Sequence, residues 1–157
     1  MPVTLPPFQS LLDSHAPDLH RFLVAAVGAH DGDDLFQETV ISALRSYPGL
    51  RHADNLRGWL FTIAHRKIID QARRRVRQAV PAGDPPEVPH LDADRLVDVE
   101  LWDAVRRLPP KQRSAVVQRY LLDRPYAEIA MVIGSSEDAA RQNVRAGLQR
   151  LRQEVTP

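Results

Sequence analysis

The chain of 157 residues contains no cysteine, which excludes disulfides, thiolate zinc sites and a cysteine nucleophile. It also lacks any apolar segment near the ~20 residues that a transmembrane helix requires. The first residues, MPVTLPPFQS, have no positive cluster followed by an apolar run, so no secretory signal peptide is predicted. These absences predict a soluble, cytoplasmic protein.

Motifs for catalysis are missing as well. There is no phosphate-binding glycine loop and no nucleophile motif, and the histidines are scattered rather than paired around a carboxylate. His65 and Asp70 share one predicted helix and are interpreted as surface or capping groups. The aspartates around Gly32 lack the glycine and distal glutamate of an EF-hand loop, so we interpret GAHDGDDL as a turn that ends one helix and caps the next. We expect no enzyme activity, no metal and no cofactor.

Charge is distributed in blocks, although the net charge is only +1. Residues 1–50 and 81–104 are acidic, with net charges of −4 and −6, whereas residues 51–80 and 105–157 are basic, with +6 and +5. Two basic segments separated by an acidic one indicate two places that contact nucleic acid.

The first basic segment predicts one long helix from Asn55 to Arg77, capped by Asp54 or Asn55. Apolar residues at three- and four-residue steps form one face: Leu56, Leu60, Ile63, Ala64, Ile68 and Ala72. The remaining surface carries Trp59 and six basic residues: Arg66, Lys67, Arg73, Arg74, Arg75 and Arg77. Such a helix fits a phosphate backbone, with a merely solvated basic face as the alternative.

Two helices are predicted before it. Apolar spacing indicates a helix within residues 6–29, with a break or kink at Pro17, and a second helix from Asp33 to Tyr47. The expected buried row of the second helix is Leu35, Phe36, Val40, Leu44 and Tyr47. Its expected outer face is Asp34, Gln37, Glu38 and Ile41.

Residues 79–95 combine several prolines with acidic residues and show no helical period, so they predict a flexible linker. We therefore expect an all-α protein with two small helical domains, residues 1–78 and 96–157. In the second domain, short helices are predicted over Leu96–Leu108, Lys111–Leu122 and Tyr126–Ile133. The expected inward residues of the middle one are Val116, Val117, Tyr120 and Leu121.

The end of the chain has the outline of a helix-turn-helix. Gly134 ends the short third helix, and Ser135 or Ser136 caps a fourth with an inner face of Ala140, Val144, Leu148, Leu151 and Val155. The outer row of this fourth helix is Arg141, Gln142, Arg145 and Gln149. Arginine and glutamine near the start of such a helix are suited to guanine and adenine edges in a major groove.

In this order, the segments resemble the extracytoplasmic-function (ECF) group of bacterial RNA polymerase sigma factors, within the sigma-70 family. FQSLLDSHAPDLHRFL, DDLFQETVISALRSY and NLRGWLFTIAHRKIIDQARRR resemble sigma region 2. LWDAVRRLPPKQRSAVVQRYLLDRPYAEIAMVIGSSEDAARQNVRAGLQRLR resembles region 4. The resemblance covers nearly the whole chain and implies a transcription initiation factor. A free-standing helix-turn-helix regulator that binds duplex DNA as a dimer is the alternative.

The resemblance also implies roles for individual residues. Core polymerase, through the clamp helices of its largest subunit, would bind Asp34, Leu35, Gln37 and Glu38. The −10 element would contact Arg51, Asn55, Trp59, Arg66, Arg73 and Arg74, with Trp59 as a core residue in the alternative. The −35 element would contact Ser136, Arg141, Gln142 and Arg145. Ala139 and Ala140 replace the family's usual Thr-Val, so the resemblance does not give a −35 sequence preference.

Further partners are implied in the same way. Region 4 of such a factor contacts the polymerase flap, and a separate anti-sigma protein commonly holds the factor inactive. We expect such an inhibitor to clamp both domains and to mask the Asp34–Glu38 and Arg141–Arg145 faces.

Overall fold

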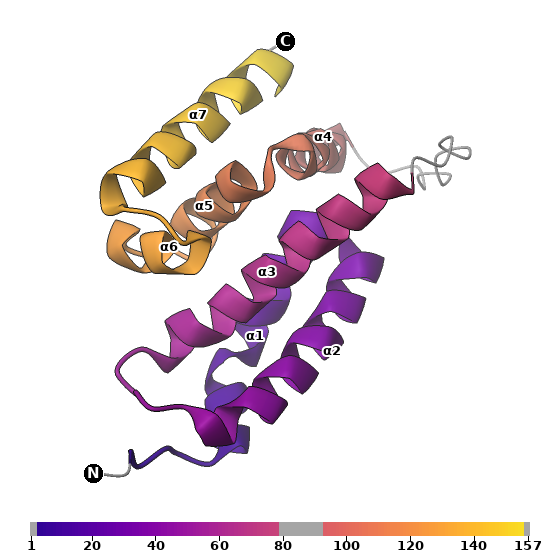
Figure 1. Cartoon of the computed structure of the whole chain (residues 1–157). Helices are drawn as coiled ribbons and strands as arrows, with labels where there is room; N and C mark the ends of the chain where they lie inside the picture. The colour runs from indigo at the N-terminus through magenta and orange to yellow at the C-terminus, as the bar shows by residue number, and fades with distance from the viewer. Residues whose placement is uncertain (1–2, 79–92, 156–157) are drawn as a thin grey trace.

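The computed structural model describes residues 3–78 and 93–155, with side chains described outside residues 93–98. In these ranges the chain is helical and has no strand, which confirms the all-α prediction (Figure 1). The helices are α1 (Phe8–Val27), α2 (Ala29–Ser46), the 3-10 turn η1 (Tyr47–Gly49), α3 (Leu56–Arg77), α4 (Ala93–Arg107), α5 (Pro110–Tyr120), α6 (Tyr126–Ile133) and α7 (Glu137–Val155). None of the described helices combines the length and apolar character needed to span a bilayer.

Helix α1 continues through Pro17, so the predicted break is wrong. Proline inside a helix costs about 3 kcal/mol, because it removes a backbone donor and crowds the preceding turn. Tertiary packing offsets this cost, since Leu11 and Leu19 are buried on either side of Pro17, and Phe22 and Leu23 are fully buried beyond it.

Helix α2 begins at Ala29, so the aspartates of GAHDGDDL lie inside its first turns and do not cap it. Gly28, with a φ of 95°, makes the sharp turn from α1. Gly32 is helical, and a Cβ there would lie 2.8 Å from Val24 Cα. Its role is therefore to let α1 and α2 approach closely.

The buried stripe of α2 is also rotated from the prediction. Leu35, Thr39 and Ala43 are buried, whereas Leu44 is 54% exposed. Of these buried residues, Thr39 and Ala43 are small and allow α2 to lie close against α1 and α3. Leu44 then lies on the opposite side of the helix.

Helix α3 matches its prediction closely. The Asn55 side-chain oxygen accepts a hydrogen bond from the Gly58 N–H at 2.8 Å, which identifies Asn55 as the cap. Leu60, Ala64 and Ile68 form the predicted apolar face and are completely buried. The basic residues lie mainly beyond it, towards the C-terminal end of the helix.

The C-terminal half contains the predicted helix-turn-helix, α6 and α7. Gly134 adopts a left-handed conformation, with a φ of 68°, and ends α6. The Ser136 hydroxyl accepts from the Ala139 N–H at 3.1 Å and caps α7. Tyr120, the last residue of α5, is 64% exposed, so the prediction that its side chain points inward is wrong.

Helix α4 begins at Ala93, earlier than the predicted Leu96. The rest of the predicted flexible linker, residues 79–92, lies outside the described residues.

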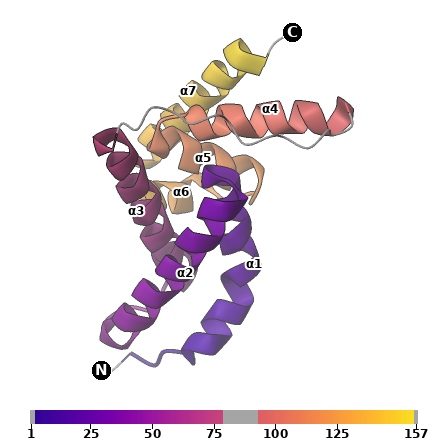
Figure 2. The same cartoon turned by 90° about the vertical axis from the view of Figure 1, so that its right-hand side faces the viewer.

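The two halves pack against each other. One hydrophobic core includes Phe61 and Ile68 of α3 together with Val105 of α4 and Val117 of α5. Both views show α6 beside α3, while α4 and α5 pack against α1 and α5 also contacts α3 (Figures 1 and 2). The basic helix α3 therefore contacts both halves of the molecule.

Candidate polymerase and nucleic-acid interfaces

The outer side of α2 combines acidic and apolar side chains. Asp34 and Gln37 are exposed, Glu38 is half-buried, and Ile41 and Leu44 are 49% and 54% exposed. Steps of three and four residues place them on one side of the helix. We call these five residues the α2 face. Large apolar groups beside a carboxylate suit a protein partner better than a nucleic acid, because a carboxylate repels phosphate.

Leu35 lies beneath this surface. It is 2% exposed and belongs to the hydrophobic core, so its side chain does not reach a partner in this arrangement. Helical spacing predicted Leu35 in the buried row, as observed, whereas the resemblance to sigma region 2 grouped it with Asp34 and Gln37 on the docking surface. Leu44, which was assigned to the core, occupies the exposed position instead.

Basic side chains line the exposed side of α3. Arg66, Arg73 and Arg74 are exposed, and Arg75 forms an ion pair with Asp31 of α2. Arg74 and Arg75 also share a groove with Asp34 and Glu38. The basic surface of α3 therefore borders the α2 face directly.

The remaining residues predicted to bind the −10 element lie in the loop before α3 and in the first turn of the helix. Arg51 and Asn55 are exposed. Trp59 is half-buried, packs against the core and contacts the Tyr47 ring with centroids 5.9 Å apart. Trp59 therefore packs against the core with one part of its side chain and leaves another part accessible, and its contact with the melted strand stays a prediction.

Helix α6 of the other half lies against the start of α3. The Asn55 side-chain amide donates to Met131 Sδ at 3.5 Å, and a Cβ on Gly58 would lie 2.6 Å from the same sulfur. In this arrangement the helix-turn-helix half therefore covers part of the surface predicted to bind the −10 element.

Polar contacts inside the same interface are largely buried. Arg57, 12% exposed, pairs with Asp18 of α1 in its own half at 3.1 Å and with Glu128 of α6 across the interface at 3.7 Å. Arg113 donates to the Ala26 carbonyl at 3.2 Å. These contacts specify how the halves fit together, because a buried ion or donor without its partner is costly.

His65 belongs to this interface, so its assignment to the surface is wrong. It is 2% exposed, and its Nδ1 lies 2.6 Å from the Ser114 hydroxyl of α5. Burial, and to a smaller extent the positive charges of Lys111, Arg113 and Arg66, together lower the pKa of His65 to about 4. The imidazole is therefore neutral near pH 7.

The residues predicted to read the −35 element surround the start of α7. Arg141, Gln142 and Arg145 are exposed, whereas Ser136 is occupied as the helix cap. The structure adds Tyr126, whose ring lies under the guanidinium groups of both Arg119 and Arg141, at 4.4 and 5.1 Å. Sequence reasoning missed this cluster because its residues come from three different helices.

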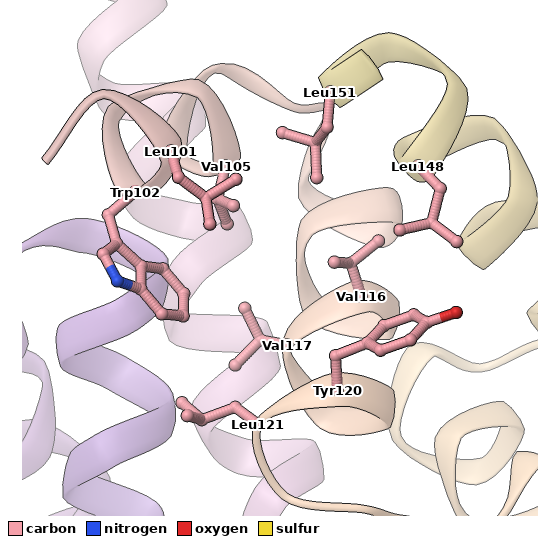
Figure 3. Close-up of a pocket in the computed structure, with 9 residues that line it drawn as sticks. All are labelled: Leu101, Trp102, Val105, Val116, Val117, Tyr120, Leu121, Leu148 and Leu151. Carbon is pink, nitrogen blue, oxygen red and sulfur yellow. The ribbon is translucent and has the colours of Figure 1, made fainter. Parts of the chain in front are cut away.

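A second surface of this half is an apolar groove of about 300 Å³ between α4, α5 and α7. Figure 3 shows side chains of all three helices directed towards it: Leu101, Trp102, Val105, Val116, Val117, Tyr120, Leu121, Leu148 and Leu151. Its shape and composition suit apolar side chains of another protein.

Comparison with known proteins agrees with this geometry. Residues 11–78 match the family model of sigma-70 region 2, and residues 98–151 match that of sigma-70 region 4. The RNA polymerase sigma factor CarQ of Myxococcus xanthus is 32% identical over 93% of this chain and 87% of its own length. This chain belongs to the ECF RNA polymerase sigma factors. The ECF sigma factor SigE of Mycolicibacterium smegmatis is also 32% identical over 94% of the chain, which spans only 61% of SigE.

Solved structures share the fold of this sigma factor. The sigma factor RpoE, in a complex with the anti-sigma factor NepR from Bartonella quintana, superposes with a TM-score of 0.74 at 23% identity, covering 96% of this chain and 98% of RpoE. CnrH, in a complex with the cytosolic domain of CnrY, gives a TM-score of 0.68 at 21% identity, covering 93% of this chain and 85% of CnrH. The common fold thus includes both halves.

Proposed function

We propose that this sigma factor binds core RNA polymerase, directs it to −10 and −35 promoter elements and promotes promoter opening. The observation that carries the proposal is the presence, on one chain, of the α2 face, the basic side of α3 and the exposed row of α7. Polymerase and chromosomal DNA place this work in the bacterial cytoplasm. The factor supplies contacts and needs no catalytic step of its own.

Core polymerase would bind at two places. The clamp helices of the largest subunit would contact the α2 face, where Ile41 and Leu44 extend the sequence-based assignment of Asp34, Gln37 and Glu38. Leu35 would support this face from below. The flap would occupy the apolar groove between α4, α5 and α7, whose size and lining suit a small cluster of apolar side chains.

Promoter DNA would also be divided between two surfaces. Arg51, Asn55 and Trp59 would capture unpaired bases of the −10 element, because a half-buried aromatic ring beside polar groups provides stacking and edge recognition. Arg66, Arg73 and Arg74 would hold the phosphates of the melted strand. The exposed side of α7 would enter the major groove at the −35 element.

We further propose that the closed arrangement is an inactive one. Met131 packs against Gly58 and contacts the exposed Asn55, so separation of the halves would give a base full access to the −10 loop. RpoE and CnrH were solved with NepR and CnrY bound. By analogy, a separate anti-sigma protein would act on this chain by stabilising the closed form, and it need not mask the α2 face.

Transcription reconstituted from purified components tests the proposed function. The full chain should support initiation from specific start sites only when core polymerase is present. A chain that forms no stable complex with core polymerase would overturn the proposal. Tight binding of the chain alone to a two-fold symmetric duplex would favour the alternative, a dimeric regulator.

A further inference from the structure

The contact between α6 and the start of α3 includes a sulfur atom. The Asn55 side-chain amide donates to Met131 Sδ at 3.5 Å, and the sulfur fills the space beside Gly58, where a Cβ would lie 2.6 Å from it. The same Asn55 side chain caps α3 by accepting from the Gly58 N–H. The thioether of one half therefore packs on the helix cap of the other half.

Other polar groups at this contact are poorly paired. Arg57 approaches Glu128 of α6 only to 3.7 Å, and its Nε and Nη2 atoms are buried without a hydrogen-bond partner among the described residues. Buried donors that lack a partner oppose the arrangement that buries them. On the α5 side of the interface, by contrast, Arg113 donates to the Ala26 carbonyl at 3.2 Å. The contact between α6 and α3 is therefore the part of the interface that a chemical change at the sulfur can loosen.

Met131 is also accessible to small oxidants. It is 43% exposed, the chain contains no cysteine, and Met1 is the only other methionine. In the reaction with hydrogen peroxide, a lone pair of the sulfur attacks one oxygen, and an S–O bond forms as the O–O bond breaks. The second oxygen leaves as water with both protons. The sulfur loses two electrons, the peroxide gains them, and the product is methionine sulfoxide.

The sulfoxide fits this contact less well than the thioether does. Its S–O group is polar and hydrated, whereas the thioether packs against the backbone of Gly58. The Gly58 side leaves no room for an added oxygen, because even a Cβ would lie 2.6 Å from the sulfur. The oxidised sulfur also has less electron density with which to accept from Asn55. Each of these effects favours withdrawal of Met131 from the cap of α3.

We propose that Met131 is an oxidation-sensitive contact, and that its conversion to the sulfoxide releases α6 from the start of α3. Reduction by a methionine sulfoxide reductase restores the contact. The release concerns the closed arrangement of the chain alone and needs no polymerase. Its consequence for transcription rests on the proposed function: the oxidised chain leaves the −10 loop more accessible and binds core polymerase more tightly.

The test treats the full chain with hydrogen peroxide until mass spectrometry shows the mass of one added oxygen on the peptide that contains Met131. Amide hydrogen exchange is then compared between the oxidised and untreated chains. Exchange at residues 55–62 should accelerate by about two- to tenfold, as for the loss of one hydrogen bond. The last turns of α7 should not change. Unchanged or slower exchange at residues 55–62 in the fully oxidised chain would overturn the inference.

Two variants assign the effect to the sulfur. Met131→Leu keeps an apolar side chain without sulfur, so peroxide should leave its exchange unchanged. Met131→Gln carries a polar amide of similar length and should show faster exchange at residues 55–62 without any oxidant. Methionine sulfoxide reductase should return the oxidised wild type to its initial exchange rate. An equal response to peroxide in Met131→Leu would assign the effect to another group and refute the role of Met131.

Affinity for core polymerase, measured on the same samples, separates this inference from the proposed function. Faster exchange together with tighter polymerase binding supports both. Faster exchange with unchanged polymerase binding supports the oxidation-sensitive contact and contradicts the proposed inactive role of the closed arrangement.

Discussion

His65 shows how its surroundings set the chemistry of one residue. On a basic amphipathic helix, a histidine is expected at the surface, yet here it lies between α3 and α5 and contacts Ser114. The unfavourable environment for its protonated form comes first from burial and then from Lys111, Arg113 and Arg66. Protonation therefore opposes the closed structure.

The first prediction concerns pH and His65. The pKa of His65 is lowered to about 4 in the folded chain, so the unfolded chain binds the extra proton more readily. The free energy of unfolding should be highest above pH 6.5 and should fall by up to about 3 kcal/mol as the pH drops towards 4. Denaturant unfolding at several pH values measures this change. His65→Asn should lack this component, and an identical pH dependence in both proteins would contradict the prediction.

Leu35 and Leu44 differ in exposure, although their spacing predicts that both are buried. Leu35 is 2% exposed and Leu44 is 54% exposed, although both are leucines on one short helix. A buried leucine contributes to stability through packing, whereas an exposed leucine beside Ile41 is available to a partner.

The second prediction follows from this difference in exposure between Leu35 and Leu44. Leu35→Ala should lower the free energy of unfolding by about 2–5 kcal/mol, because it leaves a cavity in the core. Leu44→Ala should change stability by less than about 0.5 kcal/mol but weaken binding to core polymerase. Each variant serves as the control for the other in denaturation and in polymerase binding. Equal polymerase affinity of Leu44→Ala and wild type would remove Leu44 from the docking surface.

Among whole elements, α3 and α7 present their positive charge in different structural settings. The arginines of α3 lie along one side of a long helix, next to the α2 face. This arrangement suits a single DNA strand that follows the surface of the protein. The exposed side chains of α7 begin directly after a tight, glycine-containing turn. That placement suits insertion into a groove.

The third prediction compares these two elements. Arg145→Ala should weaken promoter binding by about 1–3 kcal/mol at particular base positions, because a base contact is lost. Arg74→Ala should weaken binding almost uniformly, because it contacts phosphate. Competition among single-base promoter variants, with holoenzyme, gives both profiles. Identical sequence profiles for the two variants would refute this division between the helices.

For the whole molecule, the contact between the halves is the main constraint. Arg57, Arg113 and His65 form polar contacts across a shared hydrophobic core, and Met131 lies over Asn55 and Gly58. Under the proposed function, the closed arrangement and the binding of a base at the −10 loop compete for this surface. Partners that bind only one form will therefore shift the balance between them.

The fourth prediction is that core polymerase opens the chain. Because the protein has no cysteine, Ser10→Cys in α1 and Arg150→Cys in α7 provide two exposed labelling sites, one in each half. Energy transfer between dyes at these sites should fall when core polymerase binds. A labelled chain with the same dyes on Ser10→Cys and Arg45→Cys, both in the first half, should show little change. Unchanged transfer in a fully formed complex with the first pair would exclude opening.

The sequence by itself determined the features that depend on neighbouring residues. Helical periodicity placed α3 and α6 closely, the side chain of Asn55 marked the start of α3, and Gly134 marked the turn before α7, since these signals act within one or two turns of backbone. The net charge of each segment also identified the two basic regions, which contain α3 and the helix-turn-helix.

Only the tertiary structure decided which apolar and polar side chains face a partner helix. Pro17 stays within α1 because of packing on both sides, and His65 is buried because α5 covers α3. Leu44 is exposed because the smaller Thr39 and Ala43 face the neighbours of α2. A helix with apolar residues on several sides can turn more than one of them inward. The choice then depends on contacts between distant segments, which local spacing does not encode.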